Sequence, residues 1–236
     1  MNGCVNMNNE LFNLNISPEL RLEFLKSISK AKELMAYYEC AIMEVETKFK
    51  VLNKQFSLMA DRNPIDSIQS RLKSPESILN KMIKRNLPLT IEAIEENLTD
   101  IAGVRVICSF LEDIYTLKKA IEKQDDIKVL MIKDYIKNPK PNGYRSLHMI
   151  VEIPIFLLNE KRPMKVEIQL RTIAMQTWAS LEHQIFYKKI YPEDIIPLYK
   201  AKLLEAANIS YELDRKMQDI KKETEQKIIL CEPDLD

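Results

Sequence analysis

Apolar side chains repeat with a helical spacing over the first quarter of the chain. They follow alternating steps of four and three residues, at Phe24, Ile28, Ala31, Met35, Tyr38, Ile42, Val45, Phe49, Leu52 and Phe56. A seam sustained for about four heptads predicts a long helix that packs against another helix. That partner helix belongs either to the same chain or to a second copy, and the pattern leaves both alternatives open.

The ends of this helix are marked by residues with known positional preferences. Ser17-Pro18-Glu19 provides a capping hydroxyl, a proline for the first turn and an acid at the positive end of the helix dipole. Asn63-Pro64 marks its end. We therefore expect a disordered tail over residues 1–16 and an N-terminal helical arm over residues 17–63. A second helix opens at Ser74-Pro75-Glu76, and a short acidic helix follows over residues 91–98.

From Asp100 onward, apolar residues recur at every second position instead of at the spacing of a helix. Val104, Val106 and Cys108 alternate with other residues, as in a strand, and further strands are expected over residues 127–133, 144–153 and 164–171. A capping box at residues 109–112 predicts a helix to about residue 124, and Thr172 is expected to cap another. A last helix follows Pro197. The prediction is an α/β (α+β) fold, a mixed β-sheet of about five strands flanked by helices, with long N- and C-terminal helices.

Polar residues gather on one side of the predicted sheet. The members of this polar face are Arg105, Ser146, His148, Glu167, Gln169 and Arg171. A solvated face of an antiparallel sheet would look similar. The mixture of acids, amides, cations and a histidine favours a binding site. The domain that carries this face is expected over residues 64–190, with a C-terminal helical arm and tail over residues 191–236.

A second group of candidate binding residues lies in and around the loop between two predicted strands. Two prolines and an Asn-Gly step forbid regular structure between Asn138 and Gly143. Lysines, tyrosines, an arginine and a histidine surround this break, over residues 133–148. Such residues can bind phosphate and stack on a flat base. A solvated turn that happens to be basic is the alternative.

Two further groups indicate phosphate and metal binding. Arg71, Lys73, Ser77 and Lys81 surround the start of the second helix, an arrangement that suits a polyphosphate. Asp100 and Glu167 are candidate ligands for Mg²⁺, which proteins hold with one or two carboxylates plus substrate phosphates. The alternatives are a basic helix exposed to water and ordinary surface acids.

Composition excludes several classes of site. The chain has 35 basic and 35 acidic residues, so its net charge does not attract nucleic acid or an anionic membrane. Three glycines cannot form a Walker loop or a dinucleotide fingerprint, and two histidines exclude a His-rich metal site. Four scattered cysteines, with no secretory signal or long apolar run, predict a cytoplasmic protein with reduced thiols.

Five motifs in order resemble the synthetase domain of the RelA/SpoT family. They are Arg71-Leu72-Lys73-Ser74-Pro75-Glu76-Ser77-Ile78, Asp100-Ile101-Ala102-Gly103-Val104-Arg105, Asp134-Tyr135-Ile136, Asn142-Gly143-Tyr144-Arg145-Ser146-Leu147-His148 and Val166-Glu167-Ile168-Gln169-Leu170-Arg171-Thr172. Trp178-Ala179-Ser180-Leu181-Glu182-His183 followed by Tyr187-Lys188 is similar to the single-domain small alarmone synthetases of the RelP/RelQ type. Residues 64–70 differ from the allosteric segment of RelQ-type enzymes, so the RelP type is closer.

The resemblance implies transfer of pyrophosphate from ATP to the ribose 3′-hydroxyl of GDP or GTP, with Mg²⁺. Glu167 and Asp100 would be catalytic and would share the metal. ATP would bind Arg71, Lys73, Ser77, Lys81 and Arg105. GDP or GTP would bind Lys133, Tyr135, Lys140, Asn142, Gly143, Tyr144, Ser146, His148, Gln169 and Arg171. The resemblance also implies a homotetramer formed through the terminal helices, and no hydrolase site, because the two histidines cannot supply its metal cluster.

Two other functions remain as alternatives. Toxic relatives transfer pyrophosphate to the 3′ end of tRNA, although a neutral chain argues against a large RNA surface. A regulator that binds nucleotide or RNA without catalysis is the third possibility. Retention of both Asp100 and Glu167 weighs against it, since acids beside phosphates hinder binding unless a metal is bound. No membrane association and no stable nucleic-acid partner are expected.

Overall fold

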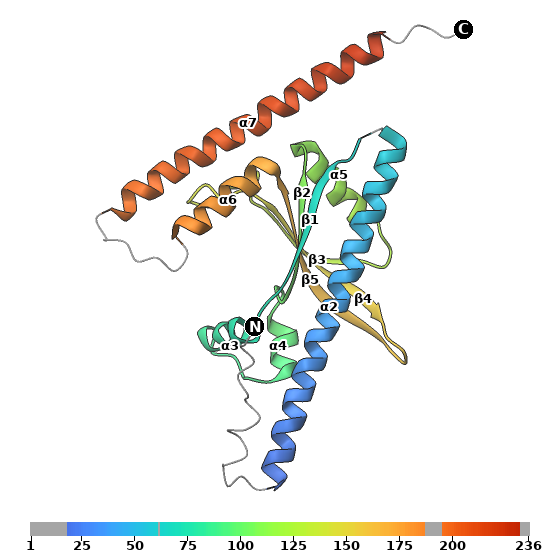
Figure 1. Ribbon diagram of the computed structural model, residues 1–236, viewed down its shortest axis with the longest axis vertical. Coiled ribbons are helices and arrows are strands. Elements are labelled where there is room, and N and C mark those ends of the chain that lie inside the picture. Colours follow the sequence, from blue (N-terminus) through green and yellow to red (C-terminus); the bar gives the residue numbers. More distant parts are fainter. Residues whose placement is uncertain (1–17, 61, 187–194, 232–236) are drawn as a thin grey trace, which may run out of the picture.

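The computed structural model describes residues 18–60, 62–186 and 195–231 of the chain. The tail predicted over residues 1–16 lies outside the described residues, as does Ser17. The helices are α2 (Pro18–Ala60), α3 (Pro75–Lys84), α4 (Ile91–Asn97), α5 (Leu111–Glu122), α6 (Ile173–Phe186) and α7 (Ile196–Cys231) (Figure 1). The strands are β1 (Ile65–Leu72), β2 (Ala102–Cys108), β3 (Lys128–Asp134), β4 (Leu147–Phe156) and β5 (Lys161–Thr172).

The five strands form one mixed sheet in the order β1-β2-β5-β4-β3. Strands β2 and β5 are parallel, and the other neighbouring pairs are antiparallel. The predicted fold class is therefore confirmed. Four of the five strands were predicted at nearly their observed positions, because each has a period-two or continuously apolar sequence.

Helix α2 packs mainly across one face of the sheet and makes a minor contact with α4 (Figure 1). Tyr38, Val45 and Phe49 are at most 2% exposed and belong to the same core as the strands. The predicted helix–helix packing is thus wrong over the described part of the seam. A helix needs only an apolar partner surface, and the inner face of a sheet provides one as well as a second helix does. The side chains of Phe24 and Ile28 lie outside the described residues.

Strand β1 was not predicted, because its sequence lacks a clear period of two. Ile65, Ile68 and Leu72 are separated by polar residues, and most of the strand is exposed or half-buried. It occupies the edge of the sheet and pairs only with β2. An edge strand buries little apolar surface, so its sequence carries a weak hydrophobic signal.

Capping side chains fix the starts of three helices. Ser74 accepts a hydrogen bond from the Ser77 backbone at the start of α3, and Thr172 accepts one from Met175 at the start of α6, as predicted. The capping box predicted at residues 109–112 is wrong by one position. Phe110 is the N-cap of α5, and its backbone N–H donates to the Asp113 carboxylate. The acid that completes the box lies one residue later than expected.

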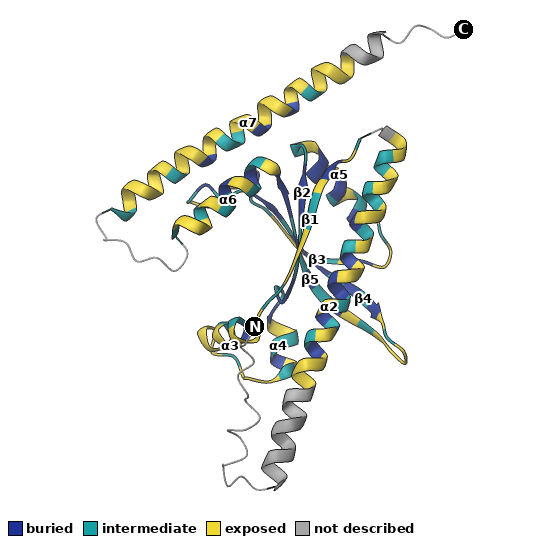
Figure 2. Ribbon diagram, viewed as in Figure 1, coloured by how far each residue is buried: buried dark blue, intermediate teal, exposed yellow. Residues whose placement is uncertain are grey.

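Helix α7 is long and mostly exposed, and it packs on α6 and α5 through a few residues (Figure 2). The Thr172 hydroxyl donates to the Asp214 carboxylate over 2.7 Å, and Gln218 accepts from the Glu112 backbone over 3.0 Å. Several apolar side chains on other faces of α7 are exposed, including Ile209, Leu213 and Ile220. Within the described residues, no helix is both long enough and apolar enough to cross a membrane.

Burial of Asp214 makes stability depend on pH. Burial raises the pKa of this carboxyl from 3.8 to about 6, although the Thr172 hydroxyl opposes the shift. The folded chain therefore binds more protons than the unfolded chain between about pH 4 and 6, and this residue's contribution to stability falls as pH rises through that window. Relative to wild type, Asp214→Asn is expected to gain on the order of 1–3 kcal/mol between pH 4 and pH 7.

Chemical denaturation of both proteins across this pH range measures that gain. Subtracting the wild-type curve removes the titration of all other groups. A difference that stays constant between pH 4 and pH 7 would contradict the expectation. Asp219→Asn, on the same helix, is the matched control and is expected to show such a constant difference.

Candidate active site

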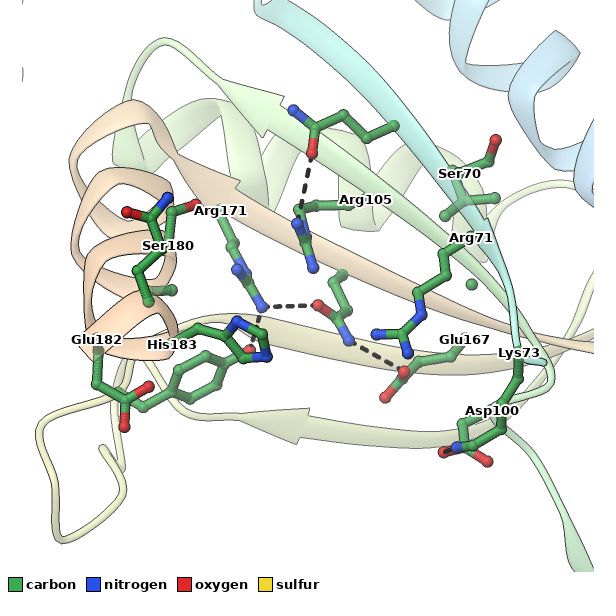
Figure 3. Close-up of a pocket in the computed structure, with 17 residues that line it drawn as sticks. Ser70, Arg71, Lys73, Asp100, Arg105, Glu167, Arg171, Ser180, Glu182 and His183 are labelled. Atoms are coloured by element: carbon green, nitrogen blue, oxygen red, sulfur yellow. Dashed lines mark hydrogen bonds and ion pairs between the residues drawn. The ribbon is translucent and has the colours of Figure 1, made fainter. Parts of the chain in front are cut away.

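A cavity of about 770 Å³ opens on the polar face of the sheet, opposite to the face covered by α2 (Figure 3). Strands β1, β2 and β5 form its floor, and α6 forms one wall. The residues that line the cavity are Gln69, Ser70, Arg71, Lys73, Asp100, Gly103, Val104, Arg105, Tyr144, Glu167, Gln169, Arg171, Ala179, Ser180, Glu182, His183 and Gln184. Eight of the sequence-predicted site residues belong to this lining, which are Arg71, Lys73, Asp100, Arg105, Tyr144, Glu167, Gln169 and Arg171.

Strand register places the predicted polar residues in rows across the sheet. One row runs Lys133, His148, Gln169, Arg105 and Gln69, each opposite the next on a neighbouring strand. The adjacent row contains Glu167, Gly103 and Arg71. Because paired residues project to the same side, the prediction of one polar face is confirmed for Arg105, His148, Glu167 and Gln169. In the second row Gly103 has no side chain, which leaves the floor open between Arg71 and Glu167.

Glu167 is the centre of a hydrogen-bonded network. Its two oxygens lie 3.0 Å from His148 Nδ1 and 3.0 Å from Gln169 Nε2. Arg171 Nη2 donates to Gln169 over 2.7 Å and to the Tyr144 hydroxyl over 2.6 Å. The Tyr144 hydroxyl in turn lies 2.9 Å from His148 Nε2. Both ring nitrogens of His148 therefore have a hydrogen-bond partner, Glu167 at Nδ1 and the Tyr144 hydroxyl at Nε2.

This network keeps Glu167 ionised. Burial favours the neutral acid, but the hydrogen bond and electrostatic attraction of His148, together with the hydrogen bond from Gln169, outweigh burial and hold the pKa of Glu167 below its usual range. The carboxylate is therefore a proton acceptor at neutral pH. Hydrogen bonds to both of its oxygens hold the carboxylate in one orientation, as a general base requires.

Asp100 lies at the other end of the floor, between two lysines. Its Oδ2 atom is 2.6 Å from Lys73 Nζ and 2.7 Å from Lys81 Nζ. Burial opposes ionisation, but these two hydrogen bonds hold the pKa of Asp100 below its ordinary value. Its Oδ1 atom is buried and has no hydrogen-bond partner. A buried carboxylate oxygen without a partner is costly unless a ligand satisfies it, so this atom fits a hard cation.

Within the described residues, no group of three or more His, Cys, Asp or Glu side chains could hold a metal ion by itself. Any cation at Asp100 would need ligands from a substrate. That requirement matches Mg²⁺ bound to a nucleotide, because Mg²⁺ commonly takes one or two carboxylates together with phosphate oxygens.

Arg71 and Arg105 lie diagonally across the β1–β2 pair, since Arg71 faces Gly103 and Arg105 faces Gln69. Diagonal positions on an antiparallel pair are about 7–8 Å apart. A planar base fits between the two side chains, because each face of the base would lie about 3.5 Å from the guanidinium that it contacts. Burial, followed by the positive charges of Arg171 and Arg71, lowers the pKa of Arg105. This concentration of cations suits an anionic ligand.

The loop that carries Tyr144 is supported by α7. Gly143 has φ +88°, and a Cβ atom there would lie 2.5 Å from the Ala207 side chain, so only glycine fits. The Arg145 guanidinium lies 4.0 Å above the Tyr211 ring and donates to the Ile136 carbonyl. These contacts fix the position of Tyr144 relative to the sheet.

The remaining predicted nucleotide-binding residues lie outside the cavity lining. Lys140 Nζ lies 4.8 Å from the centres of both the Tyr135 and Tyr144 rings. Ser146 is fully buried and donates to the Leu170 carbonyl over 3.4 Å, so its position suits support of the strand end better than contact with a substrate. The others outside the lining are Ser77, Lys81, Lys133, Asn142, Gly143 and His148.

The residues that α6 adds to the cavity were not predicted, and neither was Gln69 on β1. Ser180 and His183 lie on one side of α6, and Gln176 links Ser180 to Arg171 through two hydrogen bonds. Their spacing of three and four residues along a helix capped by Thr172 was the available signal. Gln69 was missed together with β1, and it accepts a hydrogen bond from Arg105 over 3.4 Å.

Known proteins are similar to this chain in sequence and in fold. The family profile described as "Region found in RelA / SpoT proteins" matches residues 70–191. GTP pyrophosphokinase YwaC of Bacillus subtilis is 44% identical over 82% of this chain and 91% of its own length. GTP pyrophosphokinase YjbM of the same species is 34% identical over 80% of this chain and 87% of its own length.

Solved structures agree with these relatives. Small alarmone synthetase 2 of B. subtilis has a TM-score of 0.72 and 43% identity, covering 81% of this chain and 98% of that chain. Small alarmone synthetase 1, bound to its product pppGpp, has a TM-score of 0.74 and 33% identity, covering 84% of this chain and 99% of that chain. The family match spans more than half of the chain, and the relatives are similar over most of their length. The chain therefore belongs to the RelA/SpoT family.

Proposed function

We propose that this protein is a GTP pyrophosphokinase that makes (p)ppGpp in the stringent response. The observation that carries the proposal is the pairing of an ionised, oriented Glu167 with a partner-free Asp100 oxygen in one cavity lined by cations. The relatives named above carry the same activity in their names, and the family match over residues 70–191 covers the cavity lining apart from Gln69.

In the proposed reaction the ribose 3′-oxygen of GDP or GTP attacks the β-phosphorus of ATP. The bond between the β-phosphorus and the oxygen bridging to the α-phosphate breaks, so AMP leaves and pyrophosphate stays on the 3′-oxygen. Glu167 accepts the proton of the 3′-hydroxyl and later releases it to solvent. His148 and Gln169 hold the carboxylate in place while it does so.

The donor nucleotide would bind at the Asp100 end of the cavity. Arg71 and Arg105 would stack on either side of the adenine, and Lys73, Ser77 and Lys81 would contact the phosphates. Mg²⁺, held by Asp100 and Glu167, would neutralise the charge that develops on the transferred pyrophosphate. Both lysines already reach Asp100 in this structure, so they stand beside the expected position of the metal.

The acceptor nucleotide would bind at the other end, against the loop that carries Tyr144. Tyr144 would stack on the guanine, and Arg171 and Gln169 would contact the sugar or phosphates. Lys133, Tyr135, Lys140, Asn142, Gly143, Ser146 and His148 would shape or support this pocket. Arg171 Nη2 already contacts both Tyr144 and Gln169, which links base stacking to the network around Glu167.

We also propose that the protein is a cytoplasmic homotetramer assembled through its terminal helices. The apolar side chains exposed along α7 support this assembly, since a monomer would leave them in water.

The test of the proposed function is a turnover assay with ATP, Mg²⁺ and GDP or GTP, following AMP and the guanosine product. We expect one AMP for each nucleotide that gains pyrophosphate at its 3′ position. The same assay with tRNA in place of GDP tests the toxin-like alternative. Binding of ATP and GDP with no AMP formed from either acceptor would contradict the proposal and favour a regulator without catalysis.

A further inference from the structure

Arg145 belongs to the loop motif around Tyr144, but the proposed reaction gives it no role. It is not part of the cavity lining, although its neighbour Tyr144 is. Arg145 Nη1 donates to the Ile136 carbonyl over 2.8 Å, and its guanidinium carbon lies 4.0 Å from the centre of the Tyr211 ring on α7. One side chain thus joins the start of the loop, the end of the loop and a helix outside the cavity.

The Tyr211 ring compensates a guanidinium that is partly withdrawn from water. Arg145 Nε is buried and has no hydrogen-bond partner among the described residues. A buried donor without a partner is costly, and an aromatic face offers a cation an electrostatic attraction in place of water. This attraction is larger where the cation is desolvated. The position of Arg145 is therefore expected to depend on Tyr211.

The same face of α7 contacts the loop on the other side of Tyr144. Gly143 is buried, and a Cβ atom there would lie 2.5 Å from the Ala207 side chain and 3.2 Å from Leu204. Leu204, Ala207 and Tyr211 follow one another at steps of three and four, so they share one side of the helix. The residues immediately before and after Tyr144 thus both contact a single stripe of α7.

We propose that Tyr211 is a positioning residue for acceptor binding, which stacks on Arg145 and thereby holds the Tyr144 loop ready for the acceptor nucleotide. This inference rests on the proposed function. A loop that is held before binding loses little entropy when the ligand arrives. A loop that is ready only part of the time reduces the apparent affinity by that fraction. Tyr211 acts through Arg145 and contacts no substrate itself.

The effect is expected at the acceptor nucleotide alone. Arg71 and Arg105, which would hold the donor base, lie on β1 and β2 and are positioned by the sheet. Glu167 is oriented by His148 and Gln169. Once the acceptor is bound, the transfer step should therefore proceed at the wild-type rate. A substitution that merely destabilised the protein would instead reduce the active fraction, and with it the apparent kcat.

The test measures equilibrium binding of GDP, with a non-hydrolysable ATP analogue present, to the wild type, Tyr211→Leu and Tyr211→Phe. Leucine has no aromatic face, whereas phenylalanine keeps it. We expect Tyr211→Leu to weaken GDP binding by about 5- to 30-fold, as for loss of a desolvated cation–π contact, and Tyr211→Phe to stay within about threefold of wild type. In turnover assays the KM for GDP should rise in Tyr211→Leu, while kcat and the KM for ATP change by less than about twofold.

Arg145→Met tests whether Tyr211 acts through Arg145. Alone, it should weaken GDP binding at least as much as Tyr211→Leu, because it also loses the hydrogen bond to the Ile136 carbonyl. Adding Tyr211→Leu to it should weaken binding by less than about a further twofold, since residues in contact are not additive. Thermal unfolding checks that each variant folds. If Tyr211→Leu does not fold, Arg145→Met decides alone, and wild-type affinity for GDP in that variant would contradict the inference.

Tyr37→Leu is the matched control. Arg162 lies 4.9 Å from the centre of the Tyr37 ring on α2, so the control removes the same kind of contact outside the cavity lining. It should bind GDP as the wild type does. The inference is overturned if Tyr211→Leu keeps wild-type affinity for GDP, if Tyr211→Phe loses as much as Tyr211→Leu, or if the effects of Arg145→Met and Tyr211→Leu add. Turnover of the wild type judges the proposed function separately, since these ratios of binding constants do not depend on catalysis.

Discussion

Replacement of Glu167 by glutamine is expected to lower kcat by about 10²- to 10⁴-fold, the range found when a general base is removed. Glutamine has nearly the same shape and can still accept from His148, but it cannot take a proton from a hydroxyl at neutral pH. The KM for ATP should change little. Initial rates of AMP formation at saturating ATP and GDP measure the effect, with thermal unfolding as the check on folding.

Glu152→Gln is the matched control for this variant. Glu152 is a half-buried carboxylate on β4 of the same sheet, outside the cavity, and it pairs with Lys128 at 3.8 Å. This control should keep the wild-type rate. If Glu167→Gln retained more than about a tenth of the wild-type kcat, Glu167 would not be the base.

Asp100→Asn is expected to lower activity by at least about 10²-fold and to raise the Mg²⁺ concentration needed for half-maximal rate. Asparagine still offers an oxygen to Lys73 and Lys81 but removes the negative charge from the proposed metal ligand. Because those lysines then have no counter-charge, the affinity for ATP without Mg²⁺ should not fall. The measurement is the rate as a function of Mg²⁺ concentration at fixed ATP and GDP.

Asp126→Asn provides a close comparison, since Asp126 is also paired with a lysine, Lys48, at 2.6 Å but is not part of the cavity lining. It should show the wild-type dependence on Mg²⁺. If Asp100→Asn left the Mg²⁺ requirement unchanged, Asp100 would not be a ligand of the metal, whatever the turnover rate of the variant.

The parts of the fold that the sequence predicted are those that depend on neighbouring residues. Ser74 and Thr172 cap helices through contacts three residues away, and strands such as 102–108 show their period of two directly. The polar face was predicted for the same reason, because alternate residues of one strand share a side. The resemblance supplied the roles of these residues, which alternation alone does not give.

The parts that were wrong or missed depend on contacts between distant segments. An apolar seam on α2 does not reveal whether its partner is a helix or a sheet, and β1 becomes a strand because β2 offers it an edge. Ser146 alternates with residues of the polar face but is buried where the loop joins β4. Glu182 reaches the cavity only because α6 packs beside β5 and β2.

The parallel pairing of β2 with β5 has a consequence for how the protein acquires its activity. These strands are far apart in the chain, and Gly103 and Glu167 lie opposite each other only after they pair. Closing so long a loop costs entropy before any contact compensates, so this step is expected late in folding. During synthesis, a chain released before residue 161 would contain Arg71, Lys73 and Asp100 without β5, the strand that carries the base. Such chains would be unable to make alarmone, which confines the signal to copies translated beyond β5.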